Sequence, residues 1–354
     1  MPGIPEDMTG ENEIAKKQYR FARFEESIVV KMTEEKSDRI QVLRGLSTIA
    51  VVLIHNTPIG LMQVWCRPFV NFSVGCFLFL SGLLSTADRW KPKKRIIKVV
   101  IPYLIWTLIY VVIHHYKAPT QIPVIYIKQL ATANAAAALY YVFVYCEFTL
   151  LIPLVDRLAK SKFHYWGFAI SPIEIVVMRL IPLLTGYEIN KYIQLIMHVS
   201  CLGWFTYFYL GYLLGNDLIK IKGTSAQLLG MWVLSIILQI LEGYGYYSIT
   251  ENICGTQLKL SAILSGVLFV LLAYKYVTSD HKTTYKYKIL YLLGDCSFGI
   301  FFSHLAVMAV LNKIPFYKTA IVYPLNAIVA IAISCGLALL GRKILGKYSK
   351  WFAF

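Results

Sequence analysis

Charged residues are scarce in this chain of 354 residues. Only 15% are Asp, Glu, Lys or Arg and 57% are hydrophobic, whereas an ordinary soluble domain carries charge on about a quarter of its residues. The mean hydropathy is +0.58. A globule this apolar could not cover its surface with polar groups, so the composition excludes a soluble enzyme and a disordered scaffold. The remaining class is a helical membrane protein, because a membrane β-barrel would show short alternating segments instead of long apolar runs.

The sequence also lacks paired cysteines, a leader peptide and a long polar segment. Its seven cysteines show no C-x-x-C spacing and lie mostly in apolar runs, which predicts buried side chains and neither disulfides nor a bound metal. Residues 1–36 contain no continuous apolar stretch, so we expect no cleavable signal peptide and expect the first hydrophobic segment to serve as the targeting signal. Any activity is therefore expected within or at the bilayer.

Long apolar runs, in contrast, occur along most of the chain. About ten of them reach the length of roughly 20 residues that a helix needs to cross the hydrocarbon core. They predict an all-α polytopic membrane protein with about ten transmembrane helices in one bundle, in which a membrane domain at 39–342 lies between a cytoplasmic N-terminal segment at 1–38 and a cytoplasmic tail at 343–354. The predicted spans are residues 41–60, 68–86, 96–115, 137–156, 165–184, 193–215, 226–243, 258–277, 288–311 and 319–341.

Basic residues are distributed unevenly between these spans. The chain has 35 Lys and Arg against 19 Asp and Glu, a net charge of +16. Most of the basic residues fall before the first span and in every second loop after it, including the cluster at 89–98. The positive-inside rule therefore predicts that both termini are cytoplasmic and that the protein spans the inner or plasma membrane several times. The rule also explains the basic excess without a nucleic-acid partner.

Two polar residues share one face of the first predicted helix. Arg44 and His55 are 11 residues apart, which at about 100° and 1.5 Å per residue is about 20° beyond three turns and about 16 Å. Arg44 would lie near the cytoplasmic surface and His55 inside the bilayer, where an ionisable side chain is costly. The alternatives are a snorkelling anchor for Arg44 and, for His55, a histidine bonded to a neighbouring helix. The alignment of the two favours a functional role.

Four segments then follow in a recognisable order. They are RGLSTIAVVLIH at 44–55, FLFLSG at 77–82, RIIKVVIPY at 95–103 and SFGIFFSH at 297–304. In this order they resemble motifs of acyltransferase family 3, the bacterial integral-membrane O-acyltransferases. The first family motif is Arg or Lys, ten residues and His, and the second is an aromatic-rich stretch ending in Ser-Gly. The third and fourth are Arg-x-x-Arg-x-x-x-Pro-Tyr and Ser-[Tyr/Phe]-x-x-Tyr-x-x-His. The resemblance covers roughly 39–342, nearly the whole chain.

The chain departs from the family pattern at a few positions. Lys98 replaces the second Arg of the third motif, and Phe301 stands where Tyr is usual in the fourth. Family members commonly carry a Trp-rich fourth helix with an acid before a Pro, whereas the segment at 140–147 keeps Glu147 and the later Pro153 but has Tyr in place of Trp. The role of Glu147 therefore rests mainly on the cost of an acid in the middle of a membrane helix.

The resemblance implies an O-acyltransferase that moves an acyl group, usually acetyl, from acyl-coenzyme A to a hydroxyl of a cell-surface or lipid-linked glycan. Such an enzyme transfers groups other than amino-acyl groups. The hydroxyl proton needs a base, and a neutral imidazole near pH 7 suits that task, so His55 is the candidate general base. An acyl-histidine on His55 is the alternative mechanism. Arg44 and Glu147 complete the predicted catalytic residues, with Glu147 as the partner that holds the other imidazole nitrogen.

The donor implied by the resemblance carries phosphates that need cations at the cytoplasmic surface. Arg44, Lys94, Arg95 and Lys98 are the predicted donor-binding residues. The three-residue spacing of Arg95 and Lys98 would place both on one helix face. The alternative for this cluster is a topological signal that keeps the loop inside the cell.

Other polar residues in the predicted spans fit more than one role. Ser81 and His304 are candidate substrate contacts, although Ser81 with its glycine neighbour also suits close helix packing, and His304 also suits a core histidine bonded to a neighbouring helix. Glu174, Arg179 and His198 are expected to line a cavity without an assigned chemical step.

Two other classes of protein compete with the acyltransferase. In a transporter or flippase for a small molecule or glycan, Arg44 and His55 would be binding residues and no acyl chemistry would occur. A sensory or partner subunit would have no reason to align an Arg and a His inside the bilayer. The expected partners of the acyltransferase are membrane lipids and a glycan acceptor, and a homo-oligomer is left open.

Overall fold

The computed structural model describes residues 36–88, 90–251, 253–279, 287–315, 317 and 321–354. All regular structure in these residues is helical, which confirms the all-α class. Most of the predicted N-terminal segment at 1–38 lies outside the described residues. The first helix, called the N-terminal helix below, covers residues 36–56 and carries both Arg44 and His55.

The remaining helices follow in order along the chain. They are α2 (Leu61–Cys66), η1 (Arg67–Phe69), α3 (Phe72–Leu83), α4 (Pro92–His115), η2 (Pro119–Gln121), α5 (Ile122–Thr132), α6 (Tyr140–Ala159), η3 (His164–Ala169), α7 (Ile170–Ile175), η4 (Val176–Leu180), α8 (Ile181–Thr185), α9 (Lys191–Val199), η5 (Leu202–Trp204), α10 (Phe205–Gly215), α11 (Ser225–Tyr247), α12 (Leu260–Thr278), α13 (Lys288–Asp295), α14 (Ser297–Leu311), α16 (Leu325–Leu345) and η7 (Gly346–Phe352).

By length and composition, 6 helices of the described residues could cross a membrane, or up to 8 if two bent pairs each count as one span. The bent pairs are α9 with η5–α10 and α13 with α14, at angles of 43° and 79°. The expected count of about ten is therefore not reached. The two remaining predicted spans coincide with the N-terminal helix and α6, which carry several charged or polar residues. Their passage through the membrane and the cytoplasmic location of the termini stay predictions.

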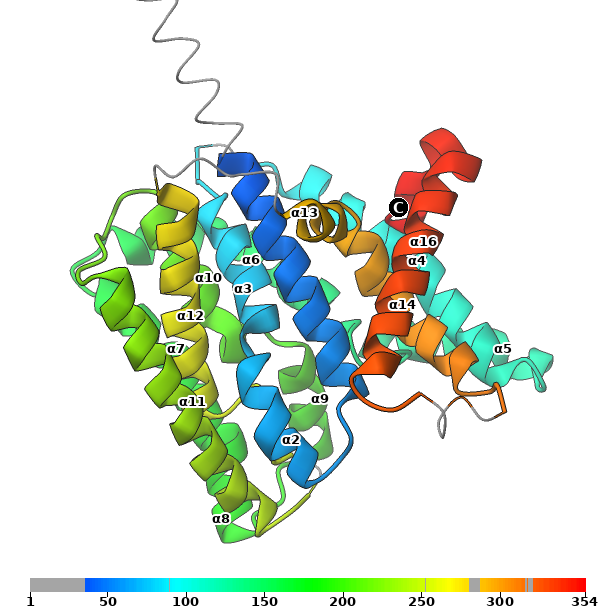
Figure 1. Cartoon of the computed structure of the whole chain (residues 1–354), viewed down its shortest axis with the longest axis horizontal. Helices are drawn as coiled ribbons and strands as arrows, with labels where there is room; N and C mark the ends of the chain where they lie inside the picture. The colour runs from blue at the N-terminus through cyan, green and yellow to red at the C-terminus, as the bar shows by residue number, and fades with distance from the viewer. Residues whose placement is uncertain (1–35, 89, 252, 280–286, 316, 318–320) are drawn as a thin grey trace, which may run out of the picture.

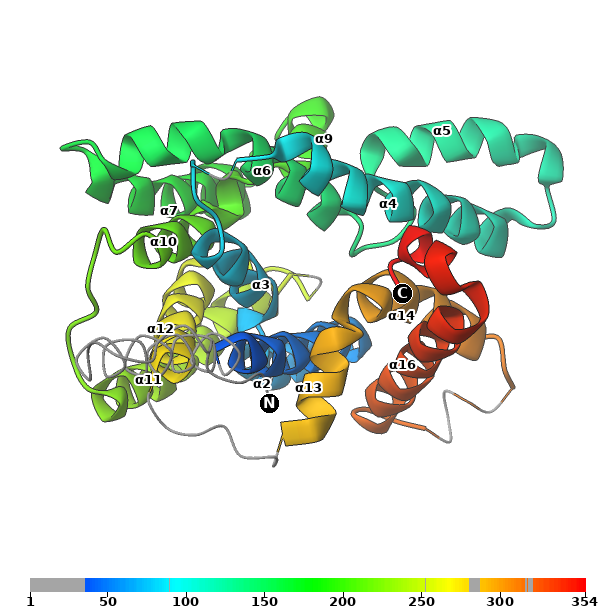
Figure 2. The same cartoon turned by 90° about the horizontal axis from the view of Figure 1, so that it is seen from above.

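The N-terminal helix runs through the middle of the molecule (Figures 1 and 2). On one side, its Leu43 and Ala50 belong to the largest apolar core, together with residues of α3, α6, α10 and α12. On the other side, its Val52 packs with Ile300 of α14 and Ala327 of α16 in a second core. The central position follows from an apolar surface that continues around the helix apart from a few polar side chains.

Glycines allow the closest helix crossings. A Cβ added to Gly45 would collide with the carbonyl of Leu290, and one added to Gly294 would collide with that of Gln41, so the N-terminal helix and α13 touch backbone to backbone. A Cβ on Gly82 of α3 would likewise strike a carbonyl of α10. The expectation that the Ser-Gly pair of α3 permits close packing is thus confirmed for the glycine.

A short helix that the sequence did not predict packs against α4. α5 lies in what was expected to be a loop, and Figure 2 shows it beside α4. The Tyr103 hydroxyl of α4 donates to the Leu130 carbonyl at 2.8 Å, and the Tyr126 hydroxyl of α5 donates to the Leu104 carbonyl at 3.2 Å. These bonds join the two helices into a hairpin.

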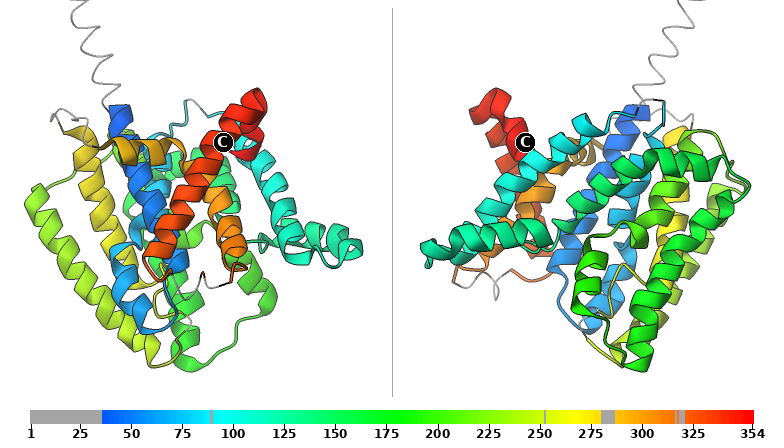
Figure 3. Two further views of the ribbon diagram at one scale, coloured as in Figure 1. Left: turned by 45° about the vertical axis from the view of Figure 1, so that its right-hand side comes forward. Right: turned by 180° about the vertical axis from the view of Figure 1, so that it is seen from behind.

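The two ends of the described chain lie toward the same end of the molecule. Figures 1 and 3 show the start of the N-terminal helix and the C-terminal residues there, while α2 and α8 lie at the opposite end. This arrangement agrees with an even number of membrane crossings. Below, the first end is called the terminal end and the other the distal end.

Candidate functional site

Two histidines from distant parts of the chain lie side by side. The rings of His55 on the N-terminal helix and His304 on α14 have centroids 5.3 Å apart. Nδ1 of His304 lies 2.9 Å from the carbonyl oxygens of Ile300 and Phe301. Because a carbonyl only accepts hydrogen bonds, Nδ1 must carry the hydrogen, and Nε2 keeps its lone pair. That buried Nε2 has no hydrogen-bond partner among the described residues.

α14 is held in register beside this histidine pair by α4. The buried Tyr110 hydroxyl donates to the Phe302 carbonyl at 2.6 Å and accepts from the Ala306 N–H at 3.2 Å. These two backbone groups flank His304 along α14. The tyrosine therefore fixes the turn that carries the histidine, a role that nothing in the sequence pattern indicated.

Arg44 and Arg95 converge at the terminal end of the bundle. Arg44 lies within electrostatic range of Tyr141 and Tyr145 of α6, and Arg95 of α4 lies within range of the same Tyr145. Nη1 of Arg95 donates to Oγ of Ser85 at 2.9 Å. Two of the predicted donor-binding residues are thus close to one tyrosine, between the N-terminal helix, α4 and α6.

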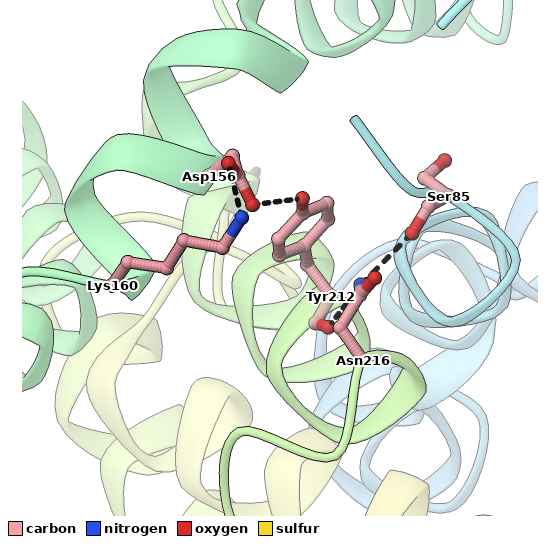
Figure 4. Close-up of polar contacts among 5 residues, drawn as sticks. All are labelled: Ser85, Asp156, Lys160, Tyr212 and Asn216. Atoms are coloured by element: carbon pink, nitrogen blue, oxygen red, sulfur yellow. Dashed lines mark hydrogen bonds and ion pairs between the residues drawn. The ribbon is translucent and has the colours of Figure 1, made fainter. Parts of the chain in front are cut away.

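Ser85 belongs to a wider polar network at the terminal end (Figure 4). Nδ2 of Asn216 donates to the Ser85 carbonyl at 3.0 Å, and the Tyr212 hydroxyl donates to Asp156 at 2.7 Å. Asp156 also pairs with Lys160 at 2.8 Å, and this hydrogen bond raises the pKa of Lys160. The network ties the ends of α3, α6 and α10 together and so supports the serine that holds Arg95. The predicted substrate contact Ser81 lies one turn earlier, and its carbonyl accepts from the Ser85 hydroxyl.

A basic groove of about 870 Å³ opens at the terminal end between α4, α14 and the C-terminal residues. Its polar lining includes Lys94 and Lys98, four residues apart, together with Lys350 and Trp351 of the chain end. Arg95 does not line this groove, since it turns toward Ser85. The side chains of Arg95 and Lys98 therefore lie in different surroundings, whereas their spacing predicted one shared phosphate site. Lys350 and Trp351 were missed, although a basic residue beside a Trp near the chain end was visible.

A smaller polar cavity, of about 250 Å³, lies nearer the distal end. Glu174, Arg179 and His198 line it, as expected. The fifth predicted span, residues 165–184, forms a helix with one π-helical turn that carries Arg179, and such turns often mark functional sites. The cavity also reaches Ile54, the residue before His55, and Arg67, which the sequence gave no reason to select.

Glu147 accepts a hydrogen bond from a residue other than His55. Its Oε2 accepts from the Cys201 backbone N–H at 2.6 Å, which joins α6 to the segment before α10. Among the described residues no hydrogen bond joins Glu147 to His55, so their pairing stays a prediction. Within the residues that the structure describes, no group of three His, Cys, Asp or Glu side chains is placed to hold a metal ion.

Neither His55 nor His304 lines the groove or the cavity, but each follows a lining residue on its own helix. Phe298 lines the basic groove and precedes His304 by six residues, about 9 Å along α14. Ile54 lines the polar cavity and directly precedes His55. The groove therefore adjoins the helix of His304, and the cavity adjoins the helix of His55.

A family model described as an acyltransferase domain, acyltransferase family 3, matches residues 37–341. The chain belongs to acyltransferase family 3. Comparisons with curated proteins and with solved structures find no match. The match includes the N-terminal helix, the start of α4 and the turn that carries His304, so this family 3 member is a membrane acyltransferase. Family membership gives the transporter alternative no support.

Proposed function

We propose that the protein is an O-acetyltransferase that moves an acetyl group from acetyl-coenzyme A, bound in the basic groove, to a hydroxyl of a cell-surface or lipid-linked glycan. The single observation that carries this proposal is the contact between His55 and His304, whose helices also contribute Ile54 to the polar cavity and Phe298 to the basic groove.

The basic groove suits a nucleotide-containing donor. Its lysines, which include Lys94, Lys98 and Lys350, offer ammonium groups for phosphates, and its apolar lining includes Ile97 and Phe298. The volume of about 870 Å³ falls in the range of roughly 300–1,000 Å³ that small-molecule sites occupy. Arg44 and Arg95 lie at the same end of the bundle, near Tyr145, and add to its positive charge.

His55 acts as the general base in this reaction. Its imidazole takes the proton from the acceptor hydroxyl while the oxygen attacks the thioester carbonyl carbon. The new ester C–O bond forms, the thioester C–S bond breaks, and the proton passes from the imidazolium to the leaving thiolate. The ring beside His55 is that of His304, whose buried Nε2 is an unused hydrogen-bond acceptor among the described residues.

The test uses the purified full-length protein in lipid nanodiscs with radiolabelled acetyl-coenzyme A and envelope glycan. We expect His55→Gln to lower acetyl transfer by a factor of about 10² to 10⁴, the usual contribution of a positioned base. His164→Gln is the matched control, since His164 lies on η3 outside the pair and its ring contacts only a local carbonyl and a neighbouring ring. A folded His55→Gln protein with wild-type transfer would refute the proposal. Radiolabelled acetyl bound covalently to the wild-type protein would instead favour the acyl-histidine mechanism.

A further inference from the structure

The polar cavity near the distal end carries an uncompensated positive charge. Its lining includes the guanidinium groups of Arg67 and Arg179 and the carboxylate of Glu174. Nη2 of Arg179 lies 3.9 Å from Oε1 of Glu174, so these two charges offset one another. Arg67 donates to the Ile54 carbonyl at 3.1 Å and has no acidic partner within ion-pair distance in the described part of the chain. The cavity is therefore cationic overall.

Three polar atoms of the same residues are buried without a partner. They are Nε of Arg67, Nε of Arg179 and Oε2 of Glu174, a residue that is only 6% exposed. Buried polar groups in folded proteins are nearly always hydrogen-bonded, because an unpaired one has lost its water without replacement. All three residues line the cavity, and two of the unpaired atoms are donors on cations, so the cavity wall has unused hydrogen-bonding capacity that favours a polar ligand.

The shape and lining of the cavity indicate the size of that ligand. Its volume of about 250 Å³ lies just below the range of roughly 300–1,000 Å³ typical of drug-sized molecules, which suits one sugar ring. The aromatic rings of Tyr140 and Trp204 line it with an interplanar angle of 22°. Aromatic side chains with a few convergent polar groups are typical of small-molecule sites.

We propose that this cavity is the acceptor site and that it selects a hydroxyl compound bearing one anionic group, either a carboxylate or a phosphate. The inference rests on the proposed acetyl transfer and names its acceptor class. Arg67 provides the geometric link, since it binds the carbonyl of the residue before His55. An anion held by Arg67 and Arg179 would place a neighbouring hydroxyl near the imidazole that takes its proton.

Charge substitutions with opposite signs separate this selection from a structural role. Arg67→Gln and Arg179→Gln each remove a cation and should weaken the binding of an anionic sugar. Glu174→Gln removes the only acid among the described lining residues and should strengthen it. Loss of folding would weaken binding in all three. Lys128→Gln is the control, because it removes one cation from the exposed surface of α5, outside the cavity.

The first arm of the experiment measures binding without any acyl donor. Isothermal titration of the full-length protein in nanodiscs uses methyl glucuronide, glucose 6-phosphate and the neutral methyl glucoside. We expect one anionic sugar to bind at least about tenfold more tightly than the neutral sugar, which also identifies carboxylate or phosphate as the preferred group. Arg67→Gln should abolish the preference, Glu174→Gln should increase it and Lys128→Gln should leave it unchanged. Equal binding of all three sugars would overturn the inference.

The second arm adds acetyl-coenzyme A and measures acetylation of the same sugars. Acetylation of neutral and anionic sugars with equal kcat/KM would overturn the inference and leave the proposed acetyl transfer intact. Anion-selective binding without acetylation of any sugar or of envelope glycan would overturn the proposed function, and with it the acceptor role of the cavity. If Arg67→Gln does not fold, Arg67→Lys retains the charge and should retain the preference for anionic sugars. The Glu174→Gln variant then still tests the inference, because it should increase that preference.

Discussion

Tyr110→Phe is a sharp test of how the histidine pair is positioned. The hydroxyl that this change removes lies between the Phe302 carbonyl and the Ala306 N–H, with distances of 2.6 Å and 3.2 Å. Tyr110 is only 2% exposed, so the freed groups would gain no water from outside. Each lost hydrogen bond lowers the free energy of unfolding by about 0.5–1.5 kcal/mol, or about 1–3 kcal/mol for the two. The loss is smaller if the Ala306 N–H then bonds directly to the Phe302 carbonyl within α14.

That direct bond would have a functional consequence. If the carbonyl and the N–H of α14 bond directly to each other, the turn that carries His304 moves relative to α4. A misplacement of about 1 Å near a reacting centre is able to lower a rate by about 10². We therefore expect Tyr110→Phe to lower kcat for acetyl transfer by about ten- to hundredfold, with the KM for acetyl-coenzyme A nearly unchanged.

The assay compares Tyr110→Phe with Tyr126→Phe, in thermal unfolding and in acetyl transfer. Tyr126 supplies a matched control, since its hydroxyl makes one exposed bond of 3.2 Å within the α4–α5 hairpin. A surface bond of this kind contributes little, so Tyr126→Phe should behave as the wild type. Equal stability and equal kcat in the two variants would refute the assigned role of Tyr110.

Three further predictions concern topology, donor binding and packing. A cysteine at Lys93 should resist an impermeant thiol reagent added to intact cells, and its labelling would place the groove outside. Lys98→Gln should raise the KM for acetyl-coenzyme A by about ten- to hundredfold, the equivalent of one charge-assisted contact of about 1.5–3 kcal/mol, and an unchanged KM would return the cluster to a topological signal. Gly45→Ala should destabilise the protein by about 1–3 kcal/mol or more, because its Cβ would strike the Leu290 carbonyl; normal thermal stability would contradict the close crossing.

Some site residues were predictable because their relation is local. Arg44 and His55 share a face of one helix, and a helix of constant pitch is all that this requires. Glu174, Arg179 and His198 were predicted to line a cavity because intramembrane polar groups avoid lipid. The unpaired atoms of Glu174 and Arg179 were not predictable, since packing decides which polar atoms find a partner.

Other expectations failed where packing decides the outcome. Arg95 and Lys98 are three residues apart, a spacing that often puts side chains on one helix face, yet Lys98 lines the groove and Arg95 turns to Ser85. Residues three or four positions apart lie on the same side of a helix, but their long side chains can turn either way. The hydrogen-bond partner near each side chain decides which way it turns. The groove instead unites Lys98 with Lys94, one turn earlier, and with the distant Lys350.

The sequence by itself determined the class of protein and the content of single helices. Scarce charge and long apolar runs require a membrane protein, since lipid is the only solvent for such a surface, and helical periodicity aligns Arg44 with His55. Only the tertiary structure decided that His304 is the ring beside His55 and that Arg67 reaches the cavity next to it. Contacts between residues so far apart in the chain depend on how the helices cross. Close backbone approaches such as that of Gly45 decide the crossing, and local periodicity does not.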